Sequence, residues 1–232
     1  MWWARVAAVV AGSLLATYLL AAYAVVPAIW TRYEREPGLA GRPMVTATAQ
    51  GIPGDPLNVS LVGSRDELVR AMQGAGWYPA DAVTLKTSVE IAGSVLFDRP
   101  YRDAPVSPLF YEGRQEDLAF EKPVGGSADR RNHVRFWQVL REGALGRPVW
   151  LGSATFDRGA GFSHDTGQIT HHIAPDIDAE RDLLMADLQG AGQFSKTYPV
   201  AGVGPTDSGR NGGGDPYFTD GDIAVGVLTP LH

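Results

Sequence analysis

The segment "LNVSLVGSRDELVRAMQGAGWYPA" (residues 57–80) combines the pattern of a strand with the signals of a capped helix. Apolar and polar residues alternate over 57–61, as in a half-buried strand. Ser64 and Glu67 then form a capping box, in which a hydroxyl and a carboxylate satisfy free amides at a helix start. Gly-Ala-Gly at 74–76 is typical of a helix end. The segment therefore predicts a strand that leads directly into a helix.

The rest of the chain shows the same mixture of patterns. A second helix capped by Asp81 and a helix over 177–190 are expected, with a hairpin over 109–124 whose turn lies near 113–117. Further strands are expected over 132–140, 148–157, 194–203 and 223–228, and a long glycine-rich loop over 204–222. Together these elements predict the α+β class, a mostly antiparallel sheet with two to three helices packed on one face.

Composition excludes several classes of function. The chain has 232 residues and a net charge of −6, with no basic run, so we expect no nucleic-acid partner. Cysteine is absent, which excludes disulfides, thiol nucleophiles and cysteine-based zinc sites. No Gly-x-Ser-x-Gly motif is present, so covalent serine chemistry is not expected.

The N-terminal region carries an uncharged run over residues 6–30. Because about 20 apolar residues suffice to cross a bilayer as a helix, the run predicts a single transmembrane anchor. The alternative is a cleaved signal peptide, since Ala22-Tyr23-Ala24 matches a cleavage site. We expect a single-pass membrane protein whose soluble domain lies outside the cytoplasm. The expected order is anchor or signal peptide (1–32), linker (33–54) and domain (55–232).

Two neighbouring strands are expected to share a polar face. Side chains alternate along a strand, so His133, Arg135 and Trp137 share one side of 132–140. Ser153, Thr155 and Asp157 share one side of 148–157 in the same way. If these sides meet, they could bind a phosphate or carboxylate or perform acid–base chemistry. The alternative is a solvent-facing sheet with cross-strand charge pairs.

Two adjacent histidines precede the helix over 177–190. His171 and His172 point to opposite sides of an extended strand, so only one is expected to reach a shared site. Asp176 and Asp178 need no function, because carboxylates are favoured at a helix start. Glu180 and Arg181 are expected to face solvent. The candidate catalytic residues are thus His133, Arg135, Asp157, His171 and His172.

A metal site is a further alternative. Two histidines and a carboxylate suit zinc or iron, and the set we expect is His133, Asp157 and His172, with His164, His171 or Asp176 as substitutes. No HxxxH or HExxH spacing supports it. We therefore expect no required cofactor and keep a divalent metal as the alternative.

The glycine-rich loop offers a third candidate. Asn211, Gly213, Gly214 and Asp215 could bring backbone amides close to an anion, and aspartates of the loop could bind calcium. A hairpin loop with Gly-Asp turns is the alternative. The candidate ligand-binding residues are Arg135, Trp137, Asn211, Gly213, Gly214 and Asp215.

Six segments in order carry a family resemblance over roughly residues 50–230. They are "GDPLNVSLVGSRDELVRAMQGAGWYPAD", "DAPVSPLFYEGRQEDLAFEKPVGGS", "RNHVRFW", "GRPVWLGSATFDRG", "THHIAPDIDAERD" and "NGGGDPYFTDG". In these segments the chain resembles the LssY C-terminal domain family. The resemblance implies a bacterial protein associated with membrane proteins, such as DedA-type proteins or lipid-phosphatase-like proteins. It implies no settled enzymatic activity, and the chain lacks the polytopic region of larger members.

The expected function is that of a membrane-anchored envelope module. It would bind, or assist, membrane proteins or lipid-derived ligands, and the bilayer would be its first partner through residues 6–30. The alternative is a metal-assisted or acid–base hydrolase centred on His133, Arg135, Asp157 and His172. The position of these side chains relative to one another discriminates between the two.

Overall fold

A computed structural model describes residues 2–21, 41–48, 51–80, 108–125, 130–162, 164, 169–201, 204 and 207–231. The chain divides into two units, Met1–Leu39 and Ala40–His232. The first unit contains helix α1 (Trp2–Leu20). Among the described residues, no helix combines the length and the apolar character needed to cross a bilayer. Residues 22–30 of the expected span lie outside the described residues, so the anchor stays a prediction.

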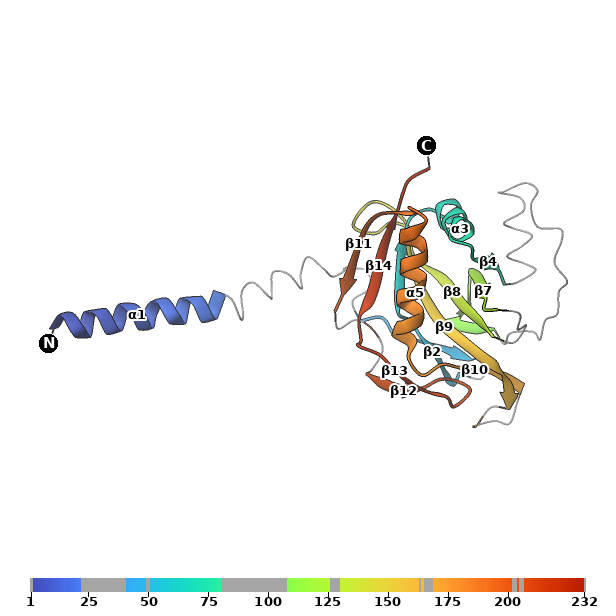
Figure 1. Ribbon diagram of the computed structural model, residues 1–232, viewed down its shortest axis with the longest axis horizontal. Helices are drawn as coiled ribbons and strands as arrows, with labels where there is room; N and C mark the ends of the chain where they lie inside the picture. Colours follow the sequence, from blue (N-terminus) through green and yellow to red (C-terminus); the bar gives the residue numbers. More distant parts are fainter. Residues whose placement is uncertain are drawn as a thin grey trace. The chain divides into compact units, whose positions relative to one another are not determined.

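The second unit is built from strands and two described helices (Figure 1). The helices are α3 (Arg65–Gly74) and α5 (Ile177–Gly190). The strands are β1 (Val45–Thr48), β2 (Pro53–Pro56), β3 (Val59–Val62), β4 (Tyr78–Pro79), β5 (Leu109–Tyr111), β6 (Arg114–Gln115), β7 (Leu118–Pro123), β8 (Arg131–Leu140), β9 (Val149–Phe162), β10 (Ile169–Ile173), β11 (Phe194–Val200), β12 (Ser208–Arg210), β13 (Pro216–Phe218) and β14 (Ile223–Leu228).

The described strands form three sheets. The main sheet has the order β11-β14-β3-β9-β8-β7-β4, and β10 pairs with the long strand β9. A four-stranded sheet has the order β2-β1-β5-β6, and β12 pairs with β13. Among the pairings described for these sheets, the β14–β3 pair is parallel and the rest are antiparallel. The predicted α+β class with a mostly antiparallel sheet is confirmed.

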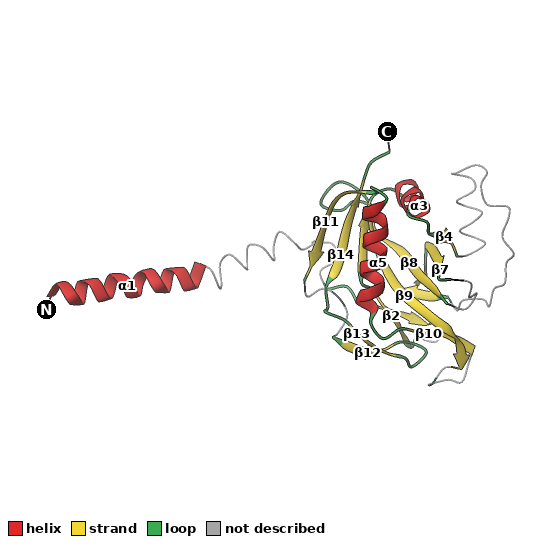
Figure 2. Cartoon of the chain, viewed as in Figure 1, coloured by secondary structure: helices red, strands yellow, loops and turns green. Residues whose placement is uncertain are grey.

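One face of the main sheet packs against the two helices, which lie beside each other in Figure 2. Val134 and Phe136 of β8 point to this face, as alternation predicts, and pack with Leu68 of α3 and Leu184 of α5. All four side chains are fully buried. Burying large apolar side chains is the main source of stability, so this face is the hydrophobic core.

The opposite face of the main sheet is covered by the four-stranded sheet. The ring centroids of Trp137 in β8 and Tyr111 in β5 lie 6.1 Å apart, and the Trp137 Nε1 donates to the Arg114 carbonyl in β6. Trp137 is therefore a buried packing residue rather than part of an open ligand site. The same face carries the polar residues of β8 and β9, which the second sheet thus removes from solvent.

The helix boundaries expected from the sequence are confirmed. Ser64 accepts from the Glu67 amide while the Glu67 carboxylate accepts from the Ser64 amide, so the capping box is complete. Both helices end in Gln-Gly-Ala-Gly, with Gly76 and Gly192 at φ values of 78° and 69°. This left-handed conformation suits glycine and ends each helix in the same way.

Three expectations about the elements need correction. The linker expected over 33–54 is too long, because β1 and the start of β2 are strands of the second unit. The hairpin expected over 109–124 is divided between two sheets, because β5 pairs with β6 while β7 pairs with β8. The loop expected over 204–222 contains the hairpin β12–β13. The helix expected after Asp81 lies outside the described residues.

Candidate functional site

Strands β8 and β9 bring three pairs of polar residues together in a single row. The register confirms that the two predicted faces meet, because His133 is paired with Thr155 and Arg135 with Ser153. A third pair, Arg131 with Asp157, extends the row. We call this set the polar row: Arg131, His133, Arg135, Ser153, Thr155 and Asp157. All six residues are buried, so the alternative of a solvent-facing sheet is wrong.

The inner end of the polar row is enclosed by carboxylates from the second sheet. An Arg135 guanidinium nitrogen, Nη1, lies 3.5 Å from Asp55 of β2, and its Nε lies 3.8 Å from Glu116. The Asn211 amide donates to Asp55 at 3.0 Å, which holds that carboxyl in place. Both N···O distances are long compared with a charge-assisted N–H···O bond, which is usually about 2.7–2.9 Å. Arg135 is therefore surrounded by acceptors but not closely bound by them.

The outer end of the polar row joins strand β10. His171 Nδ1 lies 3.2 Å from Asp157 Oδ2 and 3.4 Å from Arg131 Nη2. Arg131 also donates to Glu121 of β7 at 2.8 Å, while its Nε lies 3.6 Å from Asp157. His171 and Glu121 are partly exposed, so this end of the polar row reaches the surface.

Burial shifts the pKa values of titratable groups in and beside the polar row. Burial raises the pKa of the Asp157 carboxyl to about 6, against the lowering effect of Arg135. It also raises the pKa of Asp55 above its usual range. Burial and then the charges of Arg135 and Arg131 hold the pKa of His133 well below its usual value, so His133 is neutral at pH 7. The row therefore holds two guanidinium groups beside acids that protonate more easily than usual.

Three buried donors of the row have no hydrogen-bond partner within the described part of the chain. They are Arg131 Nε, Arg135 Nε and Ser153 Oγ. Buried polar groups are nearly always paired, so each unpaired group calls for an explanation such as a water or a ligand. Arg135 and Ser153 are paired across β8 and β9 and point to the same face, so a single acceptor group could satisfy both of them.

The two adjacent histidines contact different aspartates. His171 contacts Asp157, as described, whereas His172 Nδ1 lies 2.8 Å from Asp215 Oδ1. Alternation along β10 explains this separation. Both histidines, rather than one, therefore contact a buried carboxyl. His172 does not join the polar row, so the expected metal set of His133, Asp157 and His172 is not brought together.

Hydrogen bonds within the glycine-rich loop position Asp215 just before β13. Asn211 Oδ1 accepts from the amides of Gly213 and Asp215, and Gly214 has a φ of 82°. Gly213 and Gly214 are buried. The amides of Gly213 and Asp215 are thus used within the loop rather than offered to an anion, which agrees with the alternative of a hairpin loop built on tight turns.

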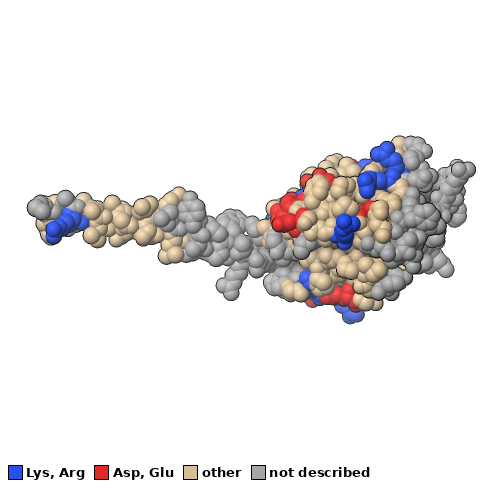
Figure 3. Space-filling view, turned by 90° about the horizontal axis from the view of Figure 1, so that it is seen from below, with Lys and Arg blue, Asp and Glu red and all other residues tan. Residues whose placement is uncertain are grey.

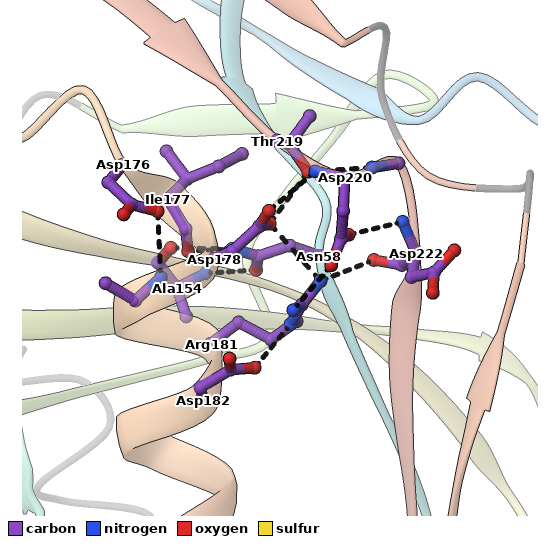
Figure 4. A network of polar contacts seen from close by, with 12 residues as sticks. Asn58, Ala154, Asp176, Ile177, Asp178, Arg181, Asp182, Thr219, Asp220 and Asp222 are labelled. Carbon is purple, nitrogen blue, oxygen red and sulfur yellow. Dashed lines mark hydrogen bonds and ion pairs between the residues drawn. The ribbon is translucent and has the colours of Figure 1, made fainter.

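Arg181 belongs to a separate network at the start of α5 (Figure 4). It donates to both oxygens of Asp220 at 2.8 and 3.0 Å and to Asp178 at 3.2 Å. The expectation that Glu180 and Arg181 face solvent is wrong, because both are buried. Asp176 caps the helix by accepting from the Ala179 amide, as its position predicts. The network ties α5 to the segment before β14, so a structural role accounts for it.

Two residues of the candidate site were missed in the sequence. Arg131 lies two positions before His133, so the alternation that selected His133 and Arg135 also selects Arg131. Asp55 lies at the expected boundary between linker and domain, and nothing in its local pattern predicts a strand there. Only the packing of the second sheet brings Asp55 next to Arg135.

On the face drawn in Figure 3, described basic side chains form separate small groups rather than one continuous patch. The family described as LssY C-terminus matches residues 39–223. The chain therefore belongs to the LssY C-terminus family, as its sequence segments predict. No curated protein and no solved structure matches it significantly.

Proposed function

We propose that the domain is a binding module whose polar row recognises a ligand with anionic oxygens, of the kind a phosphate group carries. The observation that carries this proposal is the set of unpaired buried donors at Arg131, Arg135 and Ser153, as far as the described residues extend. Two guanidinium groups from β8 and a hydroxyl from β9 belong to the same face of the sheet, where they would donate to the oxygens of a bound anion. Arginine is favoured at such sites because its planar fork matches phosphate and carboxylate groups.

The carboxylates around the row do not prevent anion binding. The nearest contacts of the unpaired Nε atoms, at 3.6 Å to Asp157 and 3.8 Å to Glu116, are too long for hydrogen bonds. With a pKa of about 6, Asp157 needs little free energy to take up a proton. A protonated Asp157 would remove one negative charge and add a donor for the ligand.

The proposed setting is the bacterial envelope. The uncharged segment 6–30 would anchor the chain, with the domain outside the cytoplasm. The ligand would be the phosphate of a lipid headgroup or a free phosphate released from one, and DedA-type or lipid-phosphatase-like membrane proteins would be partners. A reporter enzyme that is active only outside the cytoplasm, fused after His232, tests the orientation. An inactive fusion in intact cells would contradict it.

The binding proposal is tested by comparing two arginine variants of the full chain in detergent. Calorimetric titration with inorganic phosphate should show saturable binding to the wild type and to Arg141→Gln, an exposed arginine of the turn after β8. Arg131→Gln should weaken binding at least about tenfold, since a charge-assisted bond contributes about 1.5–3 kcal/mol. Co-sedimentation with phosphatidylcholine vesicles, with and without phosphatidic acid, separates a lipid phosphate from a free one. Equal binding by all three proteins would contradict the proposal.

A second candidate function is acid–base hydrolysis. The observation in its favour is the pair formed by Asp157 and His171, because a carboxyl with a pKa of about 6 suits proton transfer near neutral pH. His171 takes the place expected for His172. In this reading Arg135 would hold the substrate. Turnover of p-nitrophenyl phosphate that is lost in Asp157→Asn and kept in Arg141→Gln would favour the hydrolase. Binding without turnover would favour the module.

A further inference from the structure

The hairpin loop between β12 and β13 meets two histidines from another part of the chain. His172 and His164 each offer a ring nitrogen, and Asp215 offers a carboxylate oxygen. These ligand atoms all lie within 4.8 Å of one another, and no other described group of three histidine, aspartate or glutamate residues does so. We propose that His164, His172 and Asp215 form a binding site for zinc or a similar first-row divalent cation.

Asp215 is prepared to act as a ligand. Its carboxylate is almost fully buried, and Oδ2 accepts from the Ile173 amide at 3.1 Å, which leaves Oδ1 directed at His172. Asn211 fixes the backbone of the same residue through its amide. Metal-binding carboxylates and histidines generally depend on such outer hydrogen bonds to orient them. The loop therefore presents one fixed carboxylate oxygen.

The two histidines reach this oxygen from different points of the chain. His172 is held by the pairing of β10 with β9, opposite Gly159. His164 is held by its backbone amide, which donates to the Gly213 carbonyl at 2.9 Å. The His164 Nε2 lies 3.8 Å from Asp215 Oδ1, and the ring centroids of His164 and His172 lie 5.2 Å apart. A single His–Asp hydrogen bond would need no second histidine, so the convergence of three ligands points to a cation.

The distances suit a small cation. Zinc binds nitrogen and oxygen at about 2.0–2.1 Å, which places tetrahedral ligand atoms about 3.3–3.5 Å apart. The His172–Asp215 distance of 2.8 Å is shorter and the His164–Asp215 distance of 3.8 Å is longer. Both can be corrected by shifts of less than about 1 Å, mainly in the exposed His164 side chain. Three protein ligands would leave a fourth position for water or a substrate.

Arg158 places a positive charge close to these ligand atoms. Its Nη2 lies 3.9 Å from Asp215 Oδ1, and its side chain is half exposed, so it can move away when a metal binds. While it remains, its charge opposes that of the metal. We therefore expect Arg158→Gln to bind zinc more tightly than the wild type.

The test uses the full chain with an affinity tag that contains no histidine. After chelation and dialysis, competition with a chromophoric chelator measures the zinc affinity, and mass spectrometry of the metal measures the stoichiometry. One zinc per chain is expected. His164→Ala and His172→Ala should each weaken binding more than about tenfold, because the loss of even outer partners costs about 10- to 100-fold.

His171→Ala is the matched control, because it alters the adjacent histidine on the other side of β10 and should keep wild-type affinity. His164 is exposed, so His164→Ala should fold normally and keep its melting temperature in chelator. A wild type that binds no zinc would overturn the proposal, as would His164→Ala and His172→Ala with unchanged affinity. Phosphate binding at the polar row does not enter these measurements, so the two proposals fail independently.

Discussion

His171 and His172 are adjacent in the chain, yet their Nδ1 atoms contact different buried aspartates. His171 lies 3.2 Å from Asp157, and His172 lies 2.8 Å from Asp215. One residue of strand β10 thus joins the polar row of the main sheet, and the next joins the hairpin loop. The two candidate sites are neighbours that share a strand but no side chain.

Anion binding at the polar row should strengthen as the pH falls through about 6. Asp157, with a pKa of about 6, is charged above this value and repels an anion, and it is neutral and a donor below it. Sulfate is the suitable probe because its charge does not change between pH 5 and 8. Calorimetry should show tighter sulfate binding at pH 5.5 than at pH 7.5. Asp157→Asn should remove this dependence, and an unchanged dependence in that variant would contradict the role of Asp157.

The stability of the domain should depend on the charge of Glu180. Burial and the nearby Asp157 raise the pKa of Glu180 to about 8. A folded-state pKa above the unfolded value means that stability is full below about pH 4.5 and falls as the pH rises to 8. Glu180→Gln stays neutral, so between pH 5.5 and 8 it should gain about 2–3 kcal/mol relative to the wild type in urea unfolding. If the free energy of unfolding of Glu180→Gln and of the wild type changed with pH in parallel, the prediction would be contradicted. Glu142→Gln, at an exposed position, is the control and should follow the wild type.

Asn58 should be a major contributor to stability. Its side-chain amide donates to the carbonyls of Ala154 and Ile177, and its Oδ1 accepts from the Ala154 amide. These bonds join β9 to the first turn of α5 (Figure 4). Asn58→Ala would leave buried backbone groups unpaired and should lower the free energy of unfolding by about 2–4 kcal/mol. Urea unfolding measures this, with exposed Gln189→Ala as the control; a loss as small as the control's would contradict the prediction.

Gly152 of β9 should not tolerate a methyl group. A Cβ there would lie 2.6 Å from Phe136 and 2.7 Å from Val59, both fully buried. Gly152→Ala should therefore destabilise the domain by about 1–3 kcal/mol. Gly190→Ala, at the end of α5, meets nothing within 4 Å and should be neutral or slightly stabilising. The melting temperatures of the two variants, measured by thermal unfolding, test this prediction. Equal melting temperatures would contradict it and show that the core around residue 152 adjusts to the added methyl group.

Local signals were sufficient to predict much of the fold. The capping box at Ser64 and the apolar spacing over 177–190 placed both described helices of the second unit, because these signals act within a few residues. Alternation also placed His133 and Arg135 on the face that meets Ser153 and Asp157. The division of 109–124 between two sheets could not be predicted, because it depends on long-range pairing with β1 and β8.

The surroundings of the candidate sites were harder to predict. Asp55 contacts Arg135 only because the second sheet folds over the main one, and no short-range pattern encodes that contact. His164 and Asp215 are far apart in sequence and lack a recognisable metal spacing. Glu180 and Arg181 resemble solvent-exposed residues at a helix start, yet tertiary contacts bury both.

The most direct test of the binding proposal observes the two unpaired Nε–H groups themselves. The full chain in detergent is titrated with inorganic phosphate, and proton–nitrogen NMR spectra follow the Nε–H signals of Arg131 and Arg135. The variant Arg131→Lys assigns these signals, because it removes the one that belongs to Arg131. If the polar row binds the anion, both signals should shift together and saturate with one dissociation constant. Signals that stay in place, or that drift linearly without saturation as those of exposed arginines do, would contradict the proposal.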